Sequence, residues 1–302
     1  MPLAFCILAH KNADQIAGLL RAISLPESVC VLHYDRRAPH REQLNIDQLT
    51  HRFPGLQVLP SRRVNWGRFS QMQVQLDMMK TAMDASSQWT HLFTISGQDF
   101  PLVSAEAMEN ELAGQKDQSF VSWFDPLAVA SWANAEERLT RWYLDSPFLE
   151  EILRIPGVGR RLRRLMHWEN TFPTLPGFRR RPPAFFKWFG GANHHILARQ
   201  AVRRLLEDVE CQRIAAWLKH SGHPDESFVQ SALLNSPLAG TVVNDDRRAI
   251  YWNEGSASPR TLTLADLPEL RAARGRGKLF ARKFDSAVDN AVLQELEKDI
   301  GL

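Results

Sequence analysis

The stretch Leu3-Ala-Phe-Cys-Ile-Leu-Ala9 opens the segment that decides the fold. Its uninterrupted apolar run predicts a strand buried on both faces. Residues 13–23 then carry apolar side chains at helical spacing, and Val29-Cys-Val-Leu-His33 is a second buried strand. Strand, helix and strand within about 30 residues form a βαβ unit. We therefore expect an α/β fold whose central sheet is mostly parallel and flanked by helices.

The same patterns extend along the chain. Further strands are expected at 56–59, 90–95, 120–124, 192–197, 241–243 and 249–252. Helices are expected at about 70–85, 147–153, 158–167, 199–208, 226–234, 262–273 and 287–298. Residues 275–285 are expected to form a basic loop. Residues 125–188 are irregular and rich in Trp, Arg and Pro, and we interpret them as an insertion within one domain spanning 1–302.

Composition indicates a globular protein. With 44% hydrophobic and 24% charged residues, the chain can bury a sizeable core. No apolar stretch approaches the roughly 20 residues of a membrane span. The N-terminus lacks the basic region of a signal peptide and is interpreted as a strand. The three cysteines include no CxxC pair, and Cys6 and Cys30 are expected to be buried thiols, which favours a reducing cytoplasm.

The charge is unevenly distributed. Residues 154–188 hold eight Arg and one Lys against one Glu, a local charge of +8, so the remainder carries 3 − 8 = −5. Aromatic residues are interleaved with these arginines: Trp168, Phe172, Phe178, Phe185, Phe186 and Trp188. The pattern fits a solvated face, an anionic membrane surface or a polyanionic substrate. Because no nucleic-acid motif accompanies it, nucleic acid ranks last. Docking on the inner face of the cell membrane, near lipid-linked acceptors, is one hypothesis.

Polar residues follow the expected strands at the edge where parallel sheets bind their ligands. His10 follows the first strand, while His33 and Asp35 close the second. Asp99 follows a later strand, within Ser96-Gly-Gln-Asp-Phe-Pro101, which is also an ordinary turn signal. These side chains are candidates for a ligand site.

An acidic pair stands in His223-Pro-Asp-Glu-Ser-Phe228. Proline before the pair and an apolar helical run after it place Asp225 and Glu226 at a loop-to-helix junction. Such residues are either ordinary acids of a first helical turn or a positioned general base.

Motifs for metals and cofactors are missing. His194-His195 is expected in a strand, where neighbouring side chains point to opposite faces, so the pair is a poor metal site. Asp35 is followed by Arg36 and Arg37 rather than a second acid. The sequence has no HExxH, paired-cysteine, GxGxxG, P-loop or GxSxG motif. We expect neither a metal nor a cofactor.

Several short segments follow one another along the chain in a recognisable order. They are Ile7-Leu-Ala-His-Lys11, His33-Tyr-Asp35, Val64-Asn-Trp-Gly67 with Ser70, Ile95-Ser-Gly-Gln-Asp-Phe-Pro-Leu102, His223-Pro-Asp-Glu-Ser-Phe228, Ser258-Pro-Arg-Thr-Leu262 and Leu279-Phe-Ala-Arg-Lys-Phe-Asp285. Together they resemble the core-2/I-branching β-1,6-N-acetylglucosaminyltransferase and peptide O-xylosyltransferase family, in particular its compact bacterial members. The resemblance covers nearly the whole chain except the basic segment.

The resemblance implies a GT-A-like fold and an inverting, metal-independent transfer of sugar, GlcNAc or xylose, from a UDP-sugar to a glycan or other acceptor. It makes Glu226 the catalytic base and assigns Arg260 and Lys283 to the leaving diphosphate, where fixed cations replace a metal ion. The remaining residues divide between two tasks. UDP recognition is expected at Ala9, His10, His33 and Asp35, and sugar or acceptor contact at Asp99, Asp225 and Trp252.

Two other classes of function remain open. A glycoside hydrolase would use two carboxylates, such as Asp99 and Glu226, and would need no UDP. A non-catalytic protein would bind anionic lipid or polysaccharide through the basic aromatic segment. The animal members of the family are membrane-anchored enzymes with disulfides, so their acceptors are not carried over.

Overall fold

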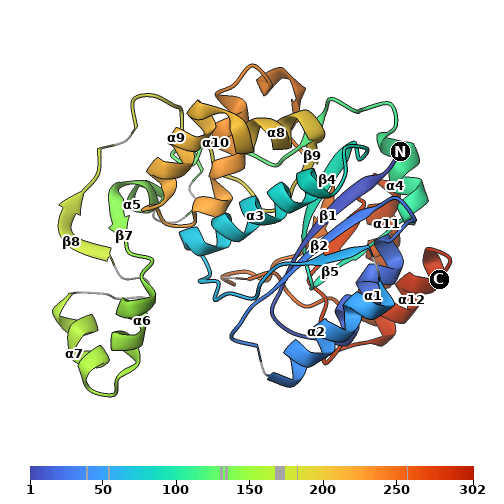
Figure 1. Ribbon diagram of the computed structural model, residues 1–302, viewed down its shortest axis with the longest axis horizontal. Helices are drawn as coiled ribbons and strands as arrows, with labels where there is room; N and C mark the ends of the chain where they lie inside the picture. Colours follow the sequence, from blue (N-terminus) through green and yellow to red (C-terminus); the bar gives the residue numbers. More distant parts are fainter. Residues whose placement is uncertain are drawn as a thin grey trace.

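The computed structural model describes residues 1–302 except 39, 54, 130, 131, 133, 134, 167–173, 182 and 257. Within the described residues, the central sheet has seven strands, in the order β10 (Val242–Val243), β6 (Ser119–Phe120), β9 (Ile196–Ala198), β4 (His91–Ser96), β1 (Leu3–Ala9), β2 (Val29–Tyr34) and β3 (Leu56–Val58) (Figure 1). The pairs β4/β1, β1/β2, β2/β3 and β10/β6 are parallel, whereas β9 runs antiparallel to β4 and β6. The expected α/β architecture, with a mostly parallel central sheet, is confirmed.

Strand β1 shows how the sequence builds two core layers. Its side chains alternate between the faces of the sheet, as the two-residue period of a strand requires. Leu3, Phe5 and Ile7 pack with α1 (Ala13–Ile23), α2 (His40–Arg52) and α4 (Ala105–Leu112). Ala4 and Cys6 pack on the other face with α3 (Phe69–Ala85), α8 (Arg199–Glu207), α9 (Val209–Leu218) and α10 (Phe228–Leu234). Helices therefore cover both faces of the sheet (Figure 1).

A second, smaller sheet forms from the strand expected at 249–252 and from two segments that were expected to be a turn and a loop. Its order is β11 (Arg248–Ile250), β12 (Phe280–Arg282) and β5 (Asp99–Pro101), and α11 (Leu267–Gly275) and α12 (Ala291–Asp299) pack on it. The prediction of a loop over residues 275–285 was therefore wrong at Phe280–Arg282, which form β12. Phe280 and Phe284 are buried and hold this segment in the core. A three-residue strand is too short to show a hydrophobic period, which explains the error.

The segment 125–188 contains α5 (Ala135–Thr140), α6 (Pro147–Arg154) and α7 (Val158–Leu165), with β7 (Arg141–Tyr143) paired antiparallel to β8 (Thr174–Arg179). The α6–α7 pair lies at one end of the molecule, away from the central sheet (Figure 1). Trp168 and Phe172 lie outside the described residues. Phe186 and Trp188 belong to the buried core, so only part of the aromatic pattern faces solvent.

Other differences concern element boundaries. Pro224–Glu226 form a 3-10 turn, η1, so the helix expected at 226–234 begins only at Phe228. The strand expected at 192–197 is confined to Ile196–Ala198, and the last helix begins at Ala291 rather than 287. The remaining 3-10 turns are η2 (Ala239–Thr241) and η3 (Leu264–Asp266). Helices α2, α4, α5 and α9 were not anticipated. Among the described residues, no helix combines the length and apolar character needed to cross a membrane.

Candidate functional site

A cavity of about 520 Å³ lies at the carboxyl ends of β1, β2 and β4. Ala9 and His10 line it at the end of β1, Asp35 follows β2, and Ser96 ends β4. This is the edge at which ligands bind in parallel sheets, because strand ends and their loops converge there. Three of the residues expected to bind UDP, namely Ala9, His10 and Asp35, therefore share one cavity.

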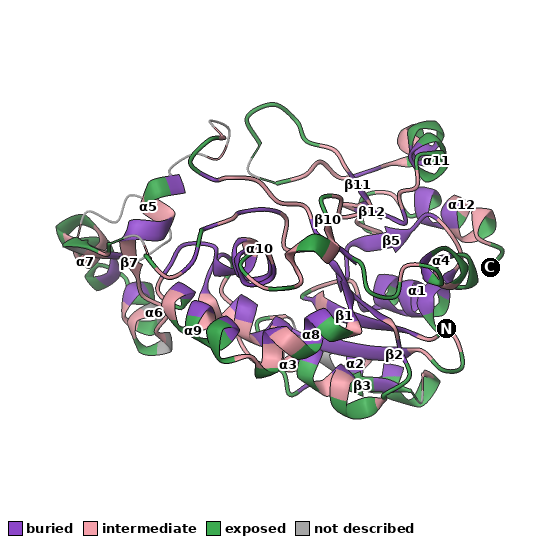
Figure 2. Cartoon of the chain, turned by 90° about the horizontal axis from the view of Figure 1, so that it is seen from above, coloured by how far each residue is buried: buried purple, intermediate pink, exposed green. Residues whose placement is uncertain are grey.

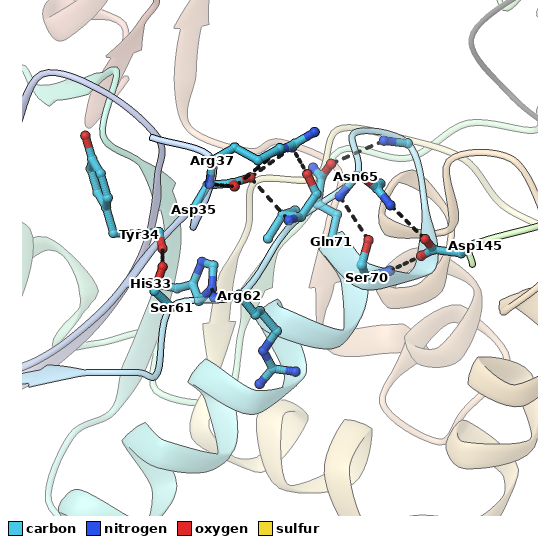
Figure 3. A network of polar contacts seen from close by, with 12 residues as sticks. His33, Tyr34, Asp35, Arg37, Ser61, Arg62, Asn65, Ser70, Gln71 and Asp145 are labelled. Carbon is cyan, nitrogen blue, oxygen red and sulfur yellow. Dashed lines mark hydrogen bonds and ion pairs between the residues drawn. The ribbon is translucent and has the colours of Figure 1, made fainter. Parts of the chain in front are cut away.

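Asp35 is held rigidly at this edge. Its carboxylate accepts hydrogen bonds from the backbone N–H groups of Arg37 (2.8 Å) and Val64 (3.2 Å), and it pairs with the Arg37 guanidinium at 2.9 Å. Burial opposes its ionisation, but these hydrogen bonds outweigh burial and lower the pKa of Asp35. His33 lies behind the cavity, fully buried, with Nε2 accepting from the Arg62 N–H at 3.2 Å (Figure 3).

The loop before α3 forms another wall of the cavity. Trp66 lines the cavity, and its neighbour Asn65 donates from Nδ2 to Asp145 Oδ1 at 2.9 Å. Asp145 also accepts from the Ser70 N–H at 2.8 Å, at the start of α3, where a carboxylate stabilises the helix terminus (Figure 3). Segment 125–188 thus fixes this wall. Gly67 has a φ of 67°, and a Cβ there would lie 2.7 Å from His223 Cε1, so only glycine fits.

The acidic pair is joined to the cavity through Asp225. This residue is buried, and its Oδ2 accepts hydrogen bonds from Gln71 (2.7 Å) and Asn193 (2.9 Å). Gln71 and Asn193 both line the cavity. Within the described part of the chain, Asp225 Oδ1 has no hydrogen-bond partner. Burial raises the pKa of Asp225.

Glu226 is the more accessible member of the pair. Its side chain is 25% exposed, and Oε2 accepts from Arg138 Nη1 at 2.9 Å. His223 Nδ1 lies 3.7 Å from Oε1, but burial and then the nearby arginines lower the pKa of His223 to about 3, so this imidazole is neutral. Burial and the charge of Asp225 raise the pKa of Glu226, and Arg138 opposes that rise. A partly exposed carboxylate with a raised pKa is suited to accept a proton near neutral pH.

Several cationic side chains lie close to His10. Partial desolvation and then the charges of Lys11 and Lys283 lower the pKa of His10. Burial, followed by the charges of Arg282 and Lys11, lowers the pKa of Lys283. Among the described residues, no carboxylate forms an ion pair with the Lys283 ammonium. The charges of Arg282 and Lys11 outweigh that of nearby Asp285, so this half-buried cation is placed to receive an anion.

Asp99 contributes to the site only indirectly. It is completely buried and accepts from the Ser96 N–H at 2.6 Å. Its Oδ1 lies 3.3 Å from Arg282 Nη1, and Arg282 lines the cavity. Asp99 therefore fixes a guanidinium that faces the ligand space.

Arg260 and Trp252 lie on the smaller sheet's side of the molecule. Arg260 pairs with Asp266 at 2.6 Å, and its guanidinium stacks over Tyr251 at 5.4 Å. The N–H of Leu262 donates to the Lys283 carbonyl at 2.8 Å, so the segments that carry Arg260 and Lys283 lie side by side. The Trp252 ring is 57% exposed. Neither Arg260, Lys283 nor Trp252 lines the cavity itself.

The model of the Core-2/I-Branching enzyme family matches residues 3–271 of this chain. The chain belongs to the Core-2/I-Branching enzyme family. It is 23% identical over 318 residues to Beta-1,3-galactosyl-O-glycosyl-glycoprotein beta-1,6-N-acetylglucosaminyltransferase 4 of Mus musculus, covering 99% of this chain and 65% of that protein. It is 24% identical over 318 residues to Xylosyltransferase oxt of Drosophila pseudoobscura pseudoobscura, covering 98% and 33%. The chain is thus shorter than these relatives and spans only part of their length.

The mouse xyloside xylosyltransferase 1 apo structure is similar over 83% of this chain and 89% of that one, with 10% identity and a TM-score of 0.38. Membership of the Core-2/I-Branching enzyme family places this chain among proteins named for the transfer of N-acetylglucosamine or xylose.

For this family member, sequence reasoning missed three residues that shape the site. Gln71 immediately follows Ser70 of a quoted motif, and Asn193 immediately precedes the His194-His195 pair, so the sequence gave a weak signal for both. The sequence gave no signal for Arg138, because it is one of many arginines in the chain. Their roles emerge only from contacts with Asp225 and Glu226.

The His194-His195 pair precedes β9 rather than lying in a strand, so the expected opposite-face geometry does not apply. His194 lines the cavity, and His195 is buried behind it. Over the residues that the structure describes, no group of three or more His, Cys, Asp or Glu side chains is placed to hold a metal ion.

Proposed function

We propose that this chain transfers a sugar from a UDP-sugar to a hydroxyl of a glycan or lipid-linked acceptor, with inversion at the anomeric carbon and without a metal ion. One observation carries the proposal: Glu226, a partly exposed carboxylate with a raised pKa, is coupled through Asp225 to the wall of the strand-end cavity. The family relationship supplies the class of reaction.

In the proposed step, Glu226 removes the proton from the acceptor hydroxyl. The acceptor oxygen attacks C1 of the donor sugar from the face opposite the leaving group. The bond between C1 and the β-phosphate oxygen breaks, and its electron pair departs with UDP. Accelerating this step requires positive charge where the diphosphate gains negative charge.

Lys283 and Arg260 would supply that charge. Lys283 is the half-buried ammonium described above, and it acts on phosphate as a point charge. Arg260 is pre-oriented by Asp266 and Tyr251, and its planar fork suits a phosphate. For Arg260 to bind the diphosphate, its ion pair with Asp266 must loosen, since the two anions compete for the same guanidinium.

The cavity is the proposed nucleotide site. Its volume of about 520 Å³ falls within the usual range of small-molecule sites, about 300–1,000 Å³. Asp35 and the backbone at Ala9 and His10 would meet the uridine, while His33 supports the edge from behind. The donor sugar would lie between this cavity and Glu226, and the exposed Trp252 remains a candidate platform for sugar stacking.

Both GlcNAc and xylose are candidate donor sugars, because relatives are named for each. The free thiols of Cys6, Cys30 and Cys211 are all buried, which supports the proposal that the chain works in a reducing cytoplasm.

The hydrolase alternative fits the structure less well. A glycoside hydrolase needs two carboxylates that face the glycosidic bond. Asp99 is completely buried and bonded to Ser96 and Arg282, so it does not face a substrate.

The deciding experiment measures UDP release from UDP-GlcNAc, UDP-xylose, UDP-glucose and UDP-galactose, each with EDTA or with Mg²⁺. Turnover of one donor, unchanged by EDTA, is expected. Loss of turnover in EDTA would contradict the assignment of Lys283 and Arg260. Glu226→Gln should bind UDP normally and lose transfer by about 100- to 10,000-fold. Retained transfer in that variant would remove Glu226 from the role of base, and absence of any UDP binding would favour the non-catalytic alternative.

A further inference from the structure

The α6–α7 pair exposes an unusual amount of apolar surface. Phe148 on α6 is 76% exposed and Leu165 on α7 is 75% exposed. Ile155 and Val158, in and after the turn between the helices, are each 49% exposed. The two helices pack against each other at the end of the molecule (Figures 1 and 2). Several large exposed apolar side chains on one small unit of a folded protein mark a surface that binds a partner or a membrane.

The same unit carries uncompensated positive charge. Helix α7 holds Arg160, Arg161, Arg163 and Arg164 and contains no acidic residue. None of these four arginines forms an ion pair with any residue that the structure describes. By contrast, the neighbouring Arg154 pairs with Glu151 at 3.3 Å. The α6–α7 pair is thus apolar and cationic at once.

The arrangement on α7 is that of an interfacial helix. Val158, Leu162 and Leu165 recur at helical spacing and line an open hollow together with Arg161 and Arg164. Arginine can lay its aliphatic stem along apolar surface while its head stays at a polar boundary. A bilayer surface provides an apolar layer and an anionic headgroup layer at adjacent depths, so it satisfies both kinds of side chain.

We propose that the α6–α7 pair docks this chain on an anionic lipid bilayer. A nucleic acid would match the arginines but leave Phe148 and Leu165 in water. A protein partner would need an acidic face next to an apolar one, and the uncompensated charge of α7 also opposes pairing with α7 of a second copy.

Docking would also set the orientation of the proposed active site. The chain that leads into α6 carries Arg138, which pairs with Glu226, and Asp145, which holds the start of α3. The acidic pair therefore lies on the side of the molecule nearest the docked unit. A lipid-linked acceptor would reach Glu226 without leaving the membrane surface, and this last point rests on the proposed function.

The test is co-sedimentation with phosphatidylcholine vesicles, with and without phosphatidylglycerol, at low and high salt. Binding to the anionic vesicles at low salt is expected, with weak binding to neutral ones. Arg161→Gln combined with Arg164→Gln should weaken binding about 30-fold, because each cation near an anionic surface strengthens binding about fivefold. Leu165→Ser should weaken it about tenfold.

Matched controls lie elsewhere on the surface. Val209→Ser on α9 removes a side chain that is 73% exposed, and Arg203→Gln on α8 removes an exposed cation. Neither should change vesicle binding. Donor hydrolysis without vesicles should be the same in all these variants, so failure of docking and failure of the proposed transfer are distinguishable.

Three outcomes would overturn the proposal. One is no binding to anionic vesicles at low salt. Another is equal binding of wild type and Leu165→Ser to vesicles, together with equally tight binding to heparin, which would indicate a charge-only polyanion site. The third is a concentration-dependent dimer that the Leu165→Ser variant abolishes, which would assign the surface to a second copy of the chain.

Discussion

The ion pair between Arg138 and Glu226 leads to a specific prediction about the pKa of Glu226. Arg138 Nη1 lies 2.9 Å from Glu226 Oε2, and their side chains are 21% and 25% exposed. Among the residues that the structure describes, the groups that act on the Glu226 carboxylate are Arg138, Asp225 and the neutral His223. Of these, only Arg138 favours the ionised form. Arg138→Met removes that charge while keeping an unbranched apolar side chain against Trp132, which the guanidinium covers at 4.4 Å.

The magnitude follows from the hydrogen bond. A hydrogen bond to a charged group contributes about 1.5–3 kcal/mol. At about 1.4 kcal/mol per pKa unit, this corresponds to a shift of about one to two units. Partial exposure of both groups favours the lower figure, about one unit. Because the lost cation stabilised the carboxylate, the pKa of Glu226 should rise.

The assay is the pH dependence of kcat/KM for transfer. A base acts only when deprotonated, so a higher pKa moves the acid limb of the profile to higher pH. Activity at and below neutral pH should fall by about tenfold, and the plateau at high pH should be largely kept. Arg138→Lys keeps a positive charge and should shift the limb less.

Arg141→Met is the matched control. Arg141 is a neighbouring arginine that pairs with Glu137 rather than with Glu226. Its replacement should leave the acid limb in place. An unmoved limb in a folded Arg138→Met protein, or a limb that moves to lower pH, would refute the reasoning about Glu226.

Three further variants test other parts of the structure. Lys283→Ala should weaken UDP binding at least about tenfold by calorimetry, since it removes a charge-assisted contact to phosphate; unchanged affinity would exclude that contact. Gly97→Ala should lower the free energy of unfolding, measured in denaturant, by about 1–3 kcal/mol, because the added Cβ would lie 2.9 Å from Ala9 Cβ. Gly114→Ala is the control, because its Cβ would meet no atom within 4 Å and should cost no such stability. Equal effects of the two substitutions would contradict the packing argument. Asp225→Asn should raise Tm at pH values above the folded-state pKa of Asp225, about 6, and hardly change Tm below about pH 4, where the unfolded chain also holds the proton. Burial raises the folded-state pKa of Asp225, so the wild type loses stability as pH rises through it, and an equal change in Tm at both pH values would contradict this.

The sequence by itself determined the parts of this protein that depend on local patterns. The buried runs at Leu3–Ala9 and Val29–Tyr34 with the helix between them specified the parallel start of the sheet. That in turn placed His10 and Asp35 at the ligand edge, where the structure has them beside the cavity. Periodicity reports burial, and strand direction fixes which loops share an edge, so no long-range information was needed.

The smaller sheet was decided by tertiary structure. Strands β5 and β12 have three residues each and pair across a separation of about 180 positions, as in Asp99 with Arg282. Strands this short show no detectable hydrophobic period in the sequence, and they form only because their partner strands are present. Their pairing buries Asp99 and turns Arg282 toward the cavity, which the sequence did not indicate.

The chemistry of the acidic pair was also decided by tertiary structure. The motif identified Asp225 and Glu226 as candidates, but their environments come from remote segments. Gln71 lies 154 positions from Asp225, and Arg138 lies 88 positions from Glu226. A pKa depends on burial and on charges within a few ångströms in space, whatever their order in the chain. For this reason the sequence could identify the two carboxylates, but only the folded chain made Asp225 a buried anchor and Glu226 an accessible carboxylate with a raised pKa.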